Sequence, residues 1–225
     1  GTGHTIEYRG SAIRALSMEA RLTICNMSIE AGARAGLIAP DQTTVDYLLP
    51  RLAFKDSAEK EQTIKNWLAW QSDPDARFDK ELIIGAATIE PMVTWGVNPA
   101  MSGGLSEKIP KAADEAAAQA LAYMGFKGGE PIAGLPIDYI FIGSCTNGRL
   151  EDLRLAAEIL RGKKIAANVI AYIVPGSEEV KRRAEQEGLS GIFQKAGCKW
   201  REPGCSLCIA MNGDIIPAGK YCAST

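Results

Sequence analysis

The second half of the chain alternates between short apolar runs and helical stretches, and this alternation limits the possible folds more than any other feature. An apolar run over 137–143 precedes a turn and a helical pattern over 150–160, and a second run over 169–174 precedes a Pro-Gly-Ser turn and a helical stretch over 178–187. Continuous apolar runs are typical of strands buried on both faces of a parallel sheet. Two such units in succession predict an α/β fold with a mainly parallel sheet.

The length and composition fit a globular protein with its own core. Of the 225 residues, 46% are apolar and 23% are charged, which is close to ordinary usage. At roughly 100 to 200 residues per domain, this length predicts one large domain or two small ones. The Gly- and Pro-rich stretch 127–136 resembles a linker or a surface crossing. We predict two subdomains, over 1–110 and 111–225, with the boundary somewhere within 96–136.

Charge and hydropathy exclude two classes of partner. The formal net charge of −2 supplies no basic field that would hold nucleic acid or an anionic membrane. The longest apolar runs, such as 82–89 and 137–143, are far shorter than the ~18 to 20 residues of a membrane helix. We therefore expect a soluble, cytoplasmic protein that binds neither nucleic acid nor membrane, with the compartment inferred from the cysteine pattern alone.

Cysteine placement is the strongest chemical signal in the sequence. The six cysteines are too sparse for a disulfide-stapled secreted scaffold, yet four of them fall within the last 28 residues, and this clustering indicates metal or redox chemistry. His4 is the only histidine, which excludes multi-histidine zinc and non-haem iron sites. A lone histidine is more often structural, so we leave His4 outside the predicted site.

A Cys-x-x-Cys motif, at Cys205 and Cys208, lies in a Gly-Pro turn and allows three interpretations. One is an iron–sulfur cluster that also uses Cys145. Another is a zinc site formed by Cys198, Cys205, Cys208 and Cys222, although this spacing is not a usual zinc-ribbon pattern. The third is a redox pair, which would normally follow a strand that is absent from the pattern here. The motif alone leaves the three open.

Two further features place thiol or polar groups where a ligand could bind. Cys145 lies just past the apolar run 137–143, and in open parallel sheets ligands bind beyond the carboxyl ends of the strands. A helix is predicted over 17–35, and its Asn26 and Glu30 are i, i+4 neighbours that share one face. The same helix carries an apolar stripe at Met18, Leu22, Cys25 and Ile29.

Five segments, in order along essentially the whole chain, resemble the aconitase superfamily and within it the large-subunit family of 3-isopropylmalate dehydratases, with homoaconitase large subunits next. The segments are GTGHTIE at 1–7, LTICNMSIEAGA at 22–33, IGSCTNGRLEDL at 142–153, VPGS at 174–177 and PGCSLC at 203–208. Their joint occurrence is highly specific. The resemblance implies a three-layer α/β/α architecture with two subdomains.

The resemblance also implies a 4Fe-4S cluster held by Cys145, Cys205 and Cys208, which leaves one iron with an open position. Dehydration of a 2-hydroxy acid requires the loss of hydroxide, a poor leaving group, and of a weakly acidic proton from the neighbouring carbon. A cation bound to the hydroxyl and carboxylate lowers both barriers. The catalytic set implied by the family motifs is Asn26, Glu30 and Asn147.

The implied activity is that of a hydro-lyase, which isomerises 2-isopropylmalate to 3-isopropylmalate by dehydration and rehydration in leucine biosynthesis. Homocitrate and citramalate-type substrates stay open, because the family's substrate choice is made largely by its small subunit. A non-enzymatic zinc-binding module is the alternative from a different class. The sequence leaves the roles of Arg149, Cys198 and Cys222 undecided.

The family also implies a partner and an incomplete chain. The catalytic base is expected on a swivel domain of a small subunit, so that the active enzyme is a heterodimer acting on a 2-hydroxy di- or tricarboxylate. An upstream domain would precede Gly1, and an arginine-bearing segment would begin at Ser224 and Thr225. We therefore expect this chain on its own to hold little or no cluster and to lack dehydratase activity.

Overall fold

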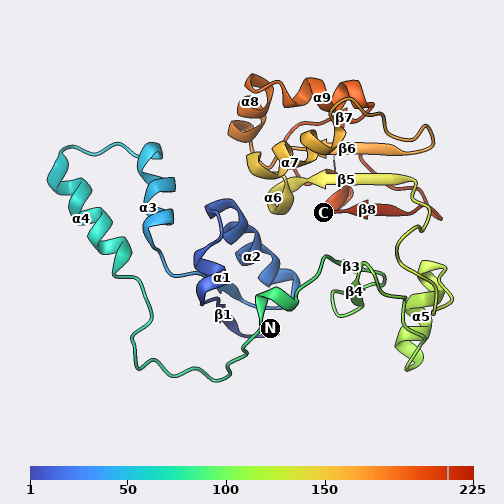
Figure 1. The fold of residues 1–225 in the computed structure, drawn as a ribbon, viewed down its shortest axis with the longest axis horizontal. Helices are drawn as coiled ribbons and strands as arrows, with labels where there is room; N and C mark the ends of the chain where they lie inside the picture. The colour runs from blue at the N-terminus through green and yellow to red at the C-terminus, as the bar shows by residue number, and fades with distance from the viewer. Residues whose placement is uncertain (212) are drawn as a thin grey trace. The chain divides into compact units, whose positions relative to one another are not determined.

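A computed structural model describes residues 1–211 and 213–225 and confirms the predicted α/β fold with a mainly parallel sheet (Figure 1). The chain forms two compact units. The larger unit comprises 1–8, 15–53 and 136–225, and the smaller unit comprises 9–14 and 54–135. The smaller unit contains almost all of the range 96–136, within which the boundary was expected. The division into subdomains over 1–110 and 111–225 stays a prediction.

The main sheet belongs to the larger unit and contains four parallel strands in the order β7-β6-β5-β8. The strands are β5 (Tyr139–Gly143), β6 (Ile170–Val174), β7 (Lys199–Trp200) and β8 (Cys222–Ser224). In the central pair, Tyr139 is opposite Ile170 and Gly143 is opposite Val174. Both predicted strands are therefore present and parallel, and their carboxyl ends lie at the same edge of the sheet.

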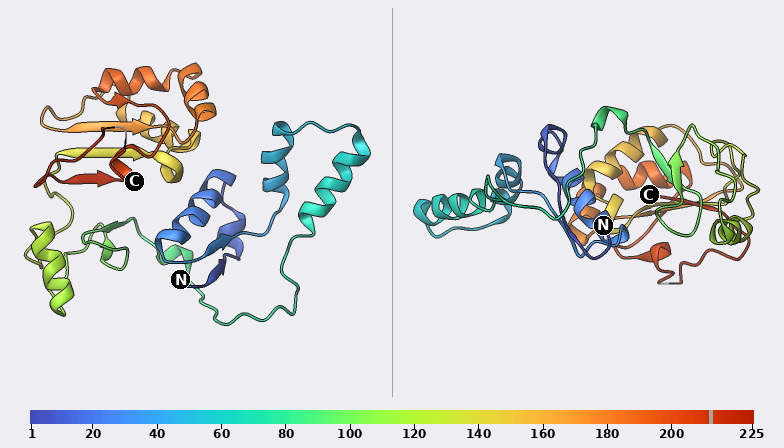
Figure 2. Two further views of the ribbon diagram at one scale, coloured as in Figure 1. Left: turned by 180° about the vertical axis from the view of Figure 1, so that it is seen from behind. Right: turned by 90° about the horizontal axis from the view of Figure 1, so that it is seen from below.

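The two faces of this sheet are covered differently (Figures 1 and 2). Helices α7 (Leu150–Leu160), α8 (Glu178–Gln186) and α9 (Leu189–Ala196) contribute to one core. It contains Leu153, Ala157, Ala171, Ile173, Ala184, Phe193 and Cys198. On the other face, Phe141, Tyr172 and Val174 form a smaller cluster that includes Leu207. The alternation of buried residues along β5 and β6 is the period of two expected for a strand that buries both faces.

The first part of the larger unit is built around α2 (Met18–Glu30), which packs on a parallel pair of strands, β1 (Thr5–Glu7) and β2 (Ala35–Leu37). α2 begins after the predicted cap Ser17, whose hydroxyl accepts a hydrogen bond from the Ala20 N–H at 3.2 Å. The prediction that this helix reaches Ala35 is wrong, because residues 35–37 pair with β1.

The apolar stripe predicted for α2 is also partly wrong. Ile29 is exposed, whereas the buried positions of the helix are Arg21 and Ser28. The Arg21 guanidinium donates to both carboxylate oxygens of Asp41, at 2.7 and 2.8 Å. Asp41 caps α3 (Gln42–Leu48), which runs into the 3-10 turn η1 (Leu49–Arg51). A partly buried ion pair therefore joins α2 to the start of α3.

The smaller unit contains α1 (Ser11–Arg14), α4 (Ser57–Leu68), η2 (Ala86–Thr88), β3 (Met92–Thr94), β4 (Ser102–Gly104) and α5 (Glu115–Met124). β3 and β4 are antiparallel. The core of this unit is formed by Trp95, Ile109, Leu121 and Ile132. Ile132 belongs to the stretch 127–136, so the interpretation of this stretch as a linker or surface crossing is wrong at that residue. Among the described helices of the whole chain, none has the length and apolar character required to cross a membrane.

Candidate metal-binding site

Cys145 lies at the carboxyl end of the central strand β5, in the single helical turn α6 (Ser144–Asn147). The residue before it, Ser144, is buried and has a φ of 63°, a left-handed conformation that is uncommon outside glycine. Cys145 itself is exposed. The sharp reversal after the strand therefore lifts the thiol away from the sheet.

Glycines allow this turn to contact the neighbouring strand directly. A Cβ atom on Gly143, whose φ is 140°, would lie 2.0 Å from the carbonyl oxygen of Val174. A Cβ atom on Gly148 would lie 2.5 Å from the Ser144 oxygen and 2.6 Å from the Val174 oxygen. The Gly176 N–H then donates to the Gly148 carbonyl at 2.8 Å. No side chain fits at Gly143 or Gly148 without movement of the backbone around Cys145.

The Cys-x-x-Cys motif forms the 3-10 turn η3 (Ser206–Cys208), closed by a 2.9 Å hydrogen bond from the Cys208 N–H to the Cys205 carbonyl. The two middle residues face the protein. Ser206 is 2% exposed, and Leu207 packs in the cluster with Phe141. Cys205 is half-buried and Cys208 is exposed. The turn thus anchors its middle residues and leaves its thiols accessible.

Helix α2 packs against the Cys145 turn. The Asn26 side-chain amide donates to the Cys145 carbonyl at 3.2 Å, and the Thr23 hydroxyl donates to the Thr146 carbonyl at 2.8 Å. At the start of the same helix, the Glu19 carboxylate accepts from the Glu151 N–H at 2.7 Å. The structure therefore brings Asn26 to the first predicted cysteine ligand, across 119 residues of sequence.

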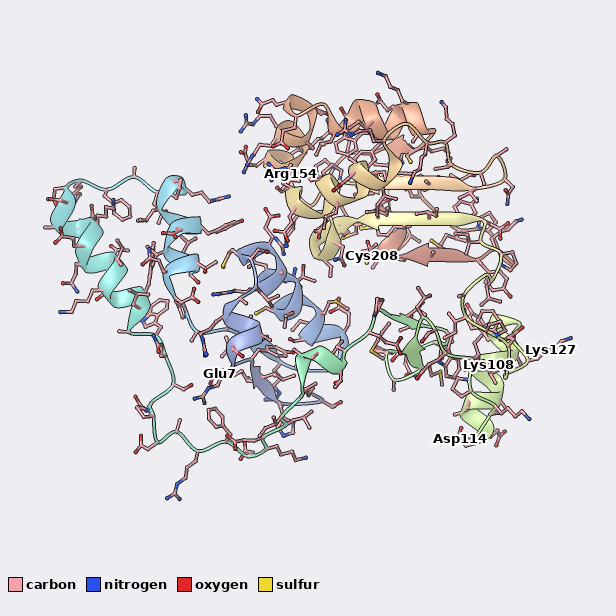
Figure 3. All side chains as sticks on the ribbon, in the orientation of Figure 1. Glu7, Lys108, Asp114, Lys127, Arg154 and Cys208 are labelled. Atoms are coloured by element: carbon pink, nitrogen blue, oxygen red, sulfur yellow. The ribbon has the colours of Figure 1, made fainter. Side chains whose placement is uncertain are left out.

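The Cys-x-x-Cys turn packs on the same sheet that carries Cys145. Leu207, between its two thiols, packs in the cluster with Phe141 of β5 and Val174 of β6, and Val174 is opposite Gly143, two residues before Cys145. Burial raises the pKa of the Cys208 thiol, and negative charge on Cys205, Cys145 and Glu30 raises it further. Figure 3 labels Cys208 among the side chains of the larger unit. That the three predicted ligands and Glu30 form one site stays a prediction.

The predicted ligands do not converge on a single point. Within 1–211 and 213–225, no three Cys, His, Asp or Glu side chains stand close enough together to hold one metal ion. A 4Fe-4S cluster takes its thiolates on different irons, so its ligands do not have to meet at a single ion. A donor set of three accessible thiols, on two loops fixed by other contacts, fits such a cluster in chemistry.

The other cysteines do not form the four-thiol set of the zinc interpretation. Cys198 is buried in the core on the helix-covered face of the sheet, whereas Cys222 packs in the cluster on the opposite face. Burial raises the pKa of both thiols, and that of Cys25. Their placement is that of small apolar core residues.

The remaining predicted residues have less distinct surroundings. Asn147 ends α6 and lines a hollow beside α7 together with Asp152, Leu155 and Thr225. His4 is exposed, and its Nδ1 lies 2.9 Å from the Thr2 carbonyl oxygen. The roles predicted for Asn26, Glu30 and Asn147 stay predictions.

Sequence reasoning missed the residues that shape this site without carrying a thiol. Gly143 and Gly148 flank Cys145, and glycines on both sides of a cysteine after an apolar run are a signal that could have indicated them. Thr23 carried no such signal, because its hydrogen-bond partner is distant in sequence.

Comparison with known proteins identifies the family of this chain. The model of the aconitase family (aconitate hydratase) matches residues 1–225. The chain is 51% identical over 232 aligned positions to a protein named 3-isopropylmalate dehydratase large subunit from Anaeromyxobacter dehalogenans, covering all of this chain and 48% of that protein. It is also 51% identical to a protein of the same name from Solibacter usitatus, covering all of this chain and 50% of that protein. The chain thus spans about half the length of these curated relatives. A family match over every residue, together with this identity, places the chain in the aconitase family.

Proposed function

We propose that this chain is the cluster-bearing part of the large subunit of an iron–sulfur hydro-lyase, which isomerises 2-isopropylmalate to 3-isopropylmalate by dehydration and rehydration in leucine biosynthesis. One observation carries the proposal: Leu207, in the middle of the Cys205–Cys208 turn, packs with Phe141 and Val174 of the two central strands, and Cys145 follows the carboxyl end of one of them. The names of the two relatives that are 51% identical support the choice of substrate.

The proposed ligands of a 4Fe-4S cluster are Cys145, Cys205 and Cys208. When bound, the cluster would supply an open iron that acts as a Lewis acid toward the hydroxyl and carboxylate of the substrate. Asn26 holds the Cys145 turn in place through the Cys145 carbonyl. Glu30 is exposed on α2, one helical turn after Asn26, and its proposed role is to face the bound substrate or water. Asn147 completes the proposed catalytic set.

The proposal includes a partner and a compartment. A small subunit with a swivel domain would supply the catalytic base, giving a heterodimer. The cytoplasm is the proposed location, because all six cysteines are free thiols and reducing compartments keep thiols in that state.

The cluster can be tested by anaerobic reconstitution of the full-length large subunit with iron and sulfide. We expect about four irons per chain and the broad visible absorption of an iron–sulfur cluster. The variants Cys145→Ser, Cys205→Ser and Cys208→Ser should each lose most of this absorption. The matched control is Cys198→Ala, whose parent thiol is buried in the core on the helix-covered face of the sheet and which should retain it. Stoichiometric zinc that persists in Cys145→Ser would contradict the proposal and favour the metal-binding module.

The substrate can be tested separately with the reconstituted large subunit and its small subunit. We expect 2-isopropylmalate to be converted to the alkene and the 3-isomer, and neither subunit alone to turn over. Preferred turnover of homocitrate or a citramalate-type acid would keep the hydro-lyase chemistry and overturn the proposed substrate.

A further inference from the structure

A buried carboxylate beside the Cys-x-x-Cys turn has no place in the function proposed above. Asp214 is 4% exposed and accepts three hydrogen bonds. The Ser206 hydroxyl donates to its Oδ2 at 2.6 Å, Arg201 Nε donates to Oδ2 at 3.1 Å, and Arg201 Nη2 donates to Oδ1 at 2.5 Å. A fully bonded buried carboxylate of this kind fixes the groups that donate to it.

The first of those groups lies inside the thiol turn. Ser206 directly follows Cys205 in the motif and has a φ of 47°. Glycine is the residue usually favoured in this left-handed conformation. The Ser206 hydroxyl provides what glycine lacks, a bond to the buried Asp214. Backbone hydrogen bonds also connect Ser206 with Asp214. The Met211 N–H donates to the Ser206 carbonyl at 2.9 Å, and the Asp214 N–H donates to the Met211 carbonyl at 3.1 Å.

The second group ties Asp214 to the sheet. Arg201 follows β7, and its N–H donates to the Ile173 carbonyl in β6 at 3.0 Å. Its guanidinium carbon lies 5.6 Å from the ring centroid of Tyr172, also in β6, within the range of a cation–π contact. A continuous set of contacts therefore runs from β6 through Arg201 and Asp214 to Ser206.

The charge of this arrangement suits a position next to thiolates. Because the Arg201 guanidinium neutralises the Asp214 carboxylate, the pair adds no net negative charge beside Cys205 and Cys208. A serine or asparagine at 214 could not accept the same three bonds with both oxygens. Position 214 thus requires a carboxylate for geometry and not for proton transfer.

Resting on the proposed iron–sulfur function, we propose that Asp214 is a positioning residue, which holds Ser206 against the sheet so that the Cys205 and Cys208 thiols are presented together to the cluster. Arg201 acts with it by fixing Asp214 to β6. Residues that orient metal ligands in this way typically change metal affinity by ~10 to 100-fold when they are replaced.

The test uses the full-length large subunit, reconstituted anaerobically, with Asp214→Asn, Ser206→Ala and Ser206→Gly. We expect each variant to release iron to a chelator at least about tenfold faster than the parent and to show a changed electron paramagnetic resonance spectrum in the reduced state. Asp214→Asn combined with Ser206→Ala should be no worse than the poorer single variant, because both remove the same contact. The matched control is Glu202→Gln, an acidic residue of the same loop whose side chain is 77% exposed.

The outcomes separate this proposal from the proposed function. If Asp214→Asn and both Ser206 variants keep the iron-release rate and spectrum of the parent while Cys208→Ser loses the cluster, the positioning role is overturned and the cluster assignment stands. If the parent takes up no cluster, both are overturned. Ser206→Gly guards against loss of folding, because glycine adopts the positive φ without strain, whereas Ser206→Ala removes only the hydroxyl. Circular dichroism of each apo variant checks that the fold is retained.

Discussion

Gly143→Ala is expected to destabilise the larger unit severely. The added methyl group would lie 2.0 Å from the carbonyl oxygen of Val174 and 2.8 Å from its carbonyl carbon, which is backbone of the adjacent central strand and cannot rotate away. The φ of 140° adds a conformational penalty for any residue other than glycine. We expect a loss of more than about 4 kcal/mol in the free energy of unfolding, a large part of the ~5 to 15 kcal/mol typical of a domain. Urea unfolding followed by circular dichroism measures it.

Two other glycines serve as matched controls. Gly162 has a φ of 72° but nothing within 4 Å of its would-be Cβ, so Gly162→Ala should cost only about 1 kcal/mol through backbone strain. Gly191 lies within α9, also with nothing within 4 Å, so Gly191→Ala should stabilise the chain by ~0.5 to 1 kcal/mol. If Gly143→Ala cost no more than Gly162→Ala, the contact between the Cys145 turn and β6 would not be as described.

Asp41→Ala is expected to destabilise the chain by about 3 to 5 kcal/mol, because it deprives a buried guanidinium of its carboxylate. The Arg21 side chain is only 3% exposed, and it makes a two-pronged ion pair with Asp41. Asp41 also caps α3 by accepting a hydrogen bond from the Thr44 N–H. Because Arg21 lies on α2, its movement would also disturb Asn26 on that helix. Equilibrium urea unfolding gives the loss in free energy directly.

Two further variants separate the loss of stability due to the Arg21–Asp41 ion pair from the loss due to the cap of α3. Asp41→Asn keeps a side-chain oxygen for the cap, worth ~1 kcal/mol, but removes the charge, so it should retain most of the loss. Arg21→Met should cost less than Asp41→Ala, because the Asp41 side chain is 33% exposed and water can hydrate it. The opposite ranking of Arg21→Met and Asp41→Ala would show that the buried charge is not the cause.

The same ion pair predicts a loss of stability in acid. The hydrogen bond from Arg21 lowers the pKa of Asp41 below its ordinary value, outweighing the opposing effect of burial. An unfolded aspartate has a pKa of ~3.9, so the contribution of the pair is complete above about pH 4 and is lost as the pH falls through the lower pKa of the folded state. Unfolding free energies measured at pH 6 and pH 3 should differ less in Asp41→Asn than in the parent chain.

The sequence predicts the central part of the sheet because its signals are local. β5 and β6 are continuous apolar runs with a turn and an amphipathic helix after each, and they lie close to where they are expected. β7 and β8 were not predicted, because two or three residues of mixed polarity carry no periodicity. Their strand conformation comes from pairing with β6 and β5, which is a tertiary effect.

The same distinction holds for α2 and the candidate site. The prediction placed the end of α2 at Ala35 and so ran past Gly32, whose φ of 81° is typical of the glycine that ends a helix. The proximity of Asn26 to Cys145 followed from a family resemblance rather than from spacing. Asp214 was missed because its partners, Ser206 and Arg201, are ordinary loop residues until the chain folds.

The anchoring of the two thiol loops bears on the order in which folding and ligand binding occur. The Cys145 turn is held by glycine contacts with β6 and by Asn26, and the Cys205–Cys208 turn is held by Leu207 and Asp214. None of these contacts uses a metal, in contrast to domains such as zinc fingers, which fold only around their ion. The polypeptide can therefore shape both thiol loops before any ligand binds, so that the proposed cluster would be assembled, and after damage rebuilt, on an already folded protein.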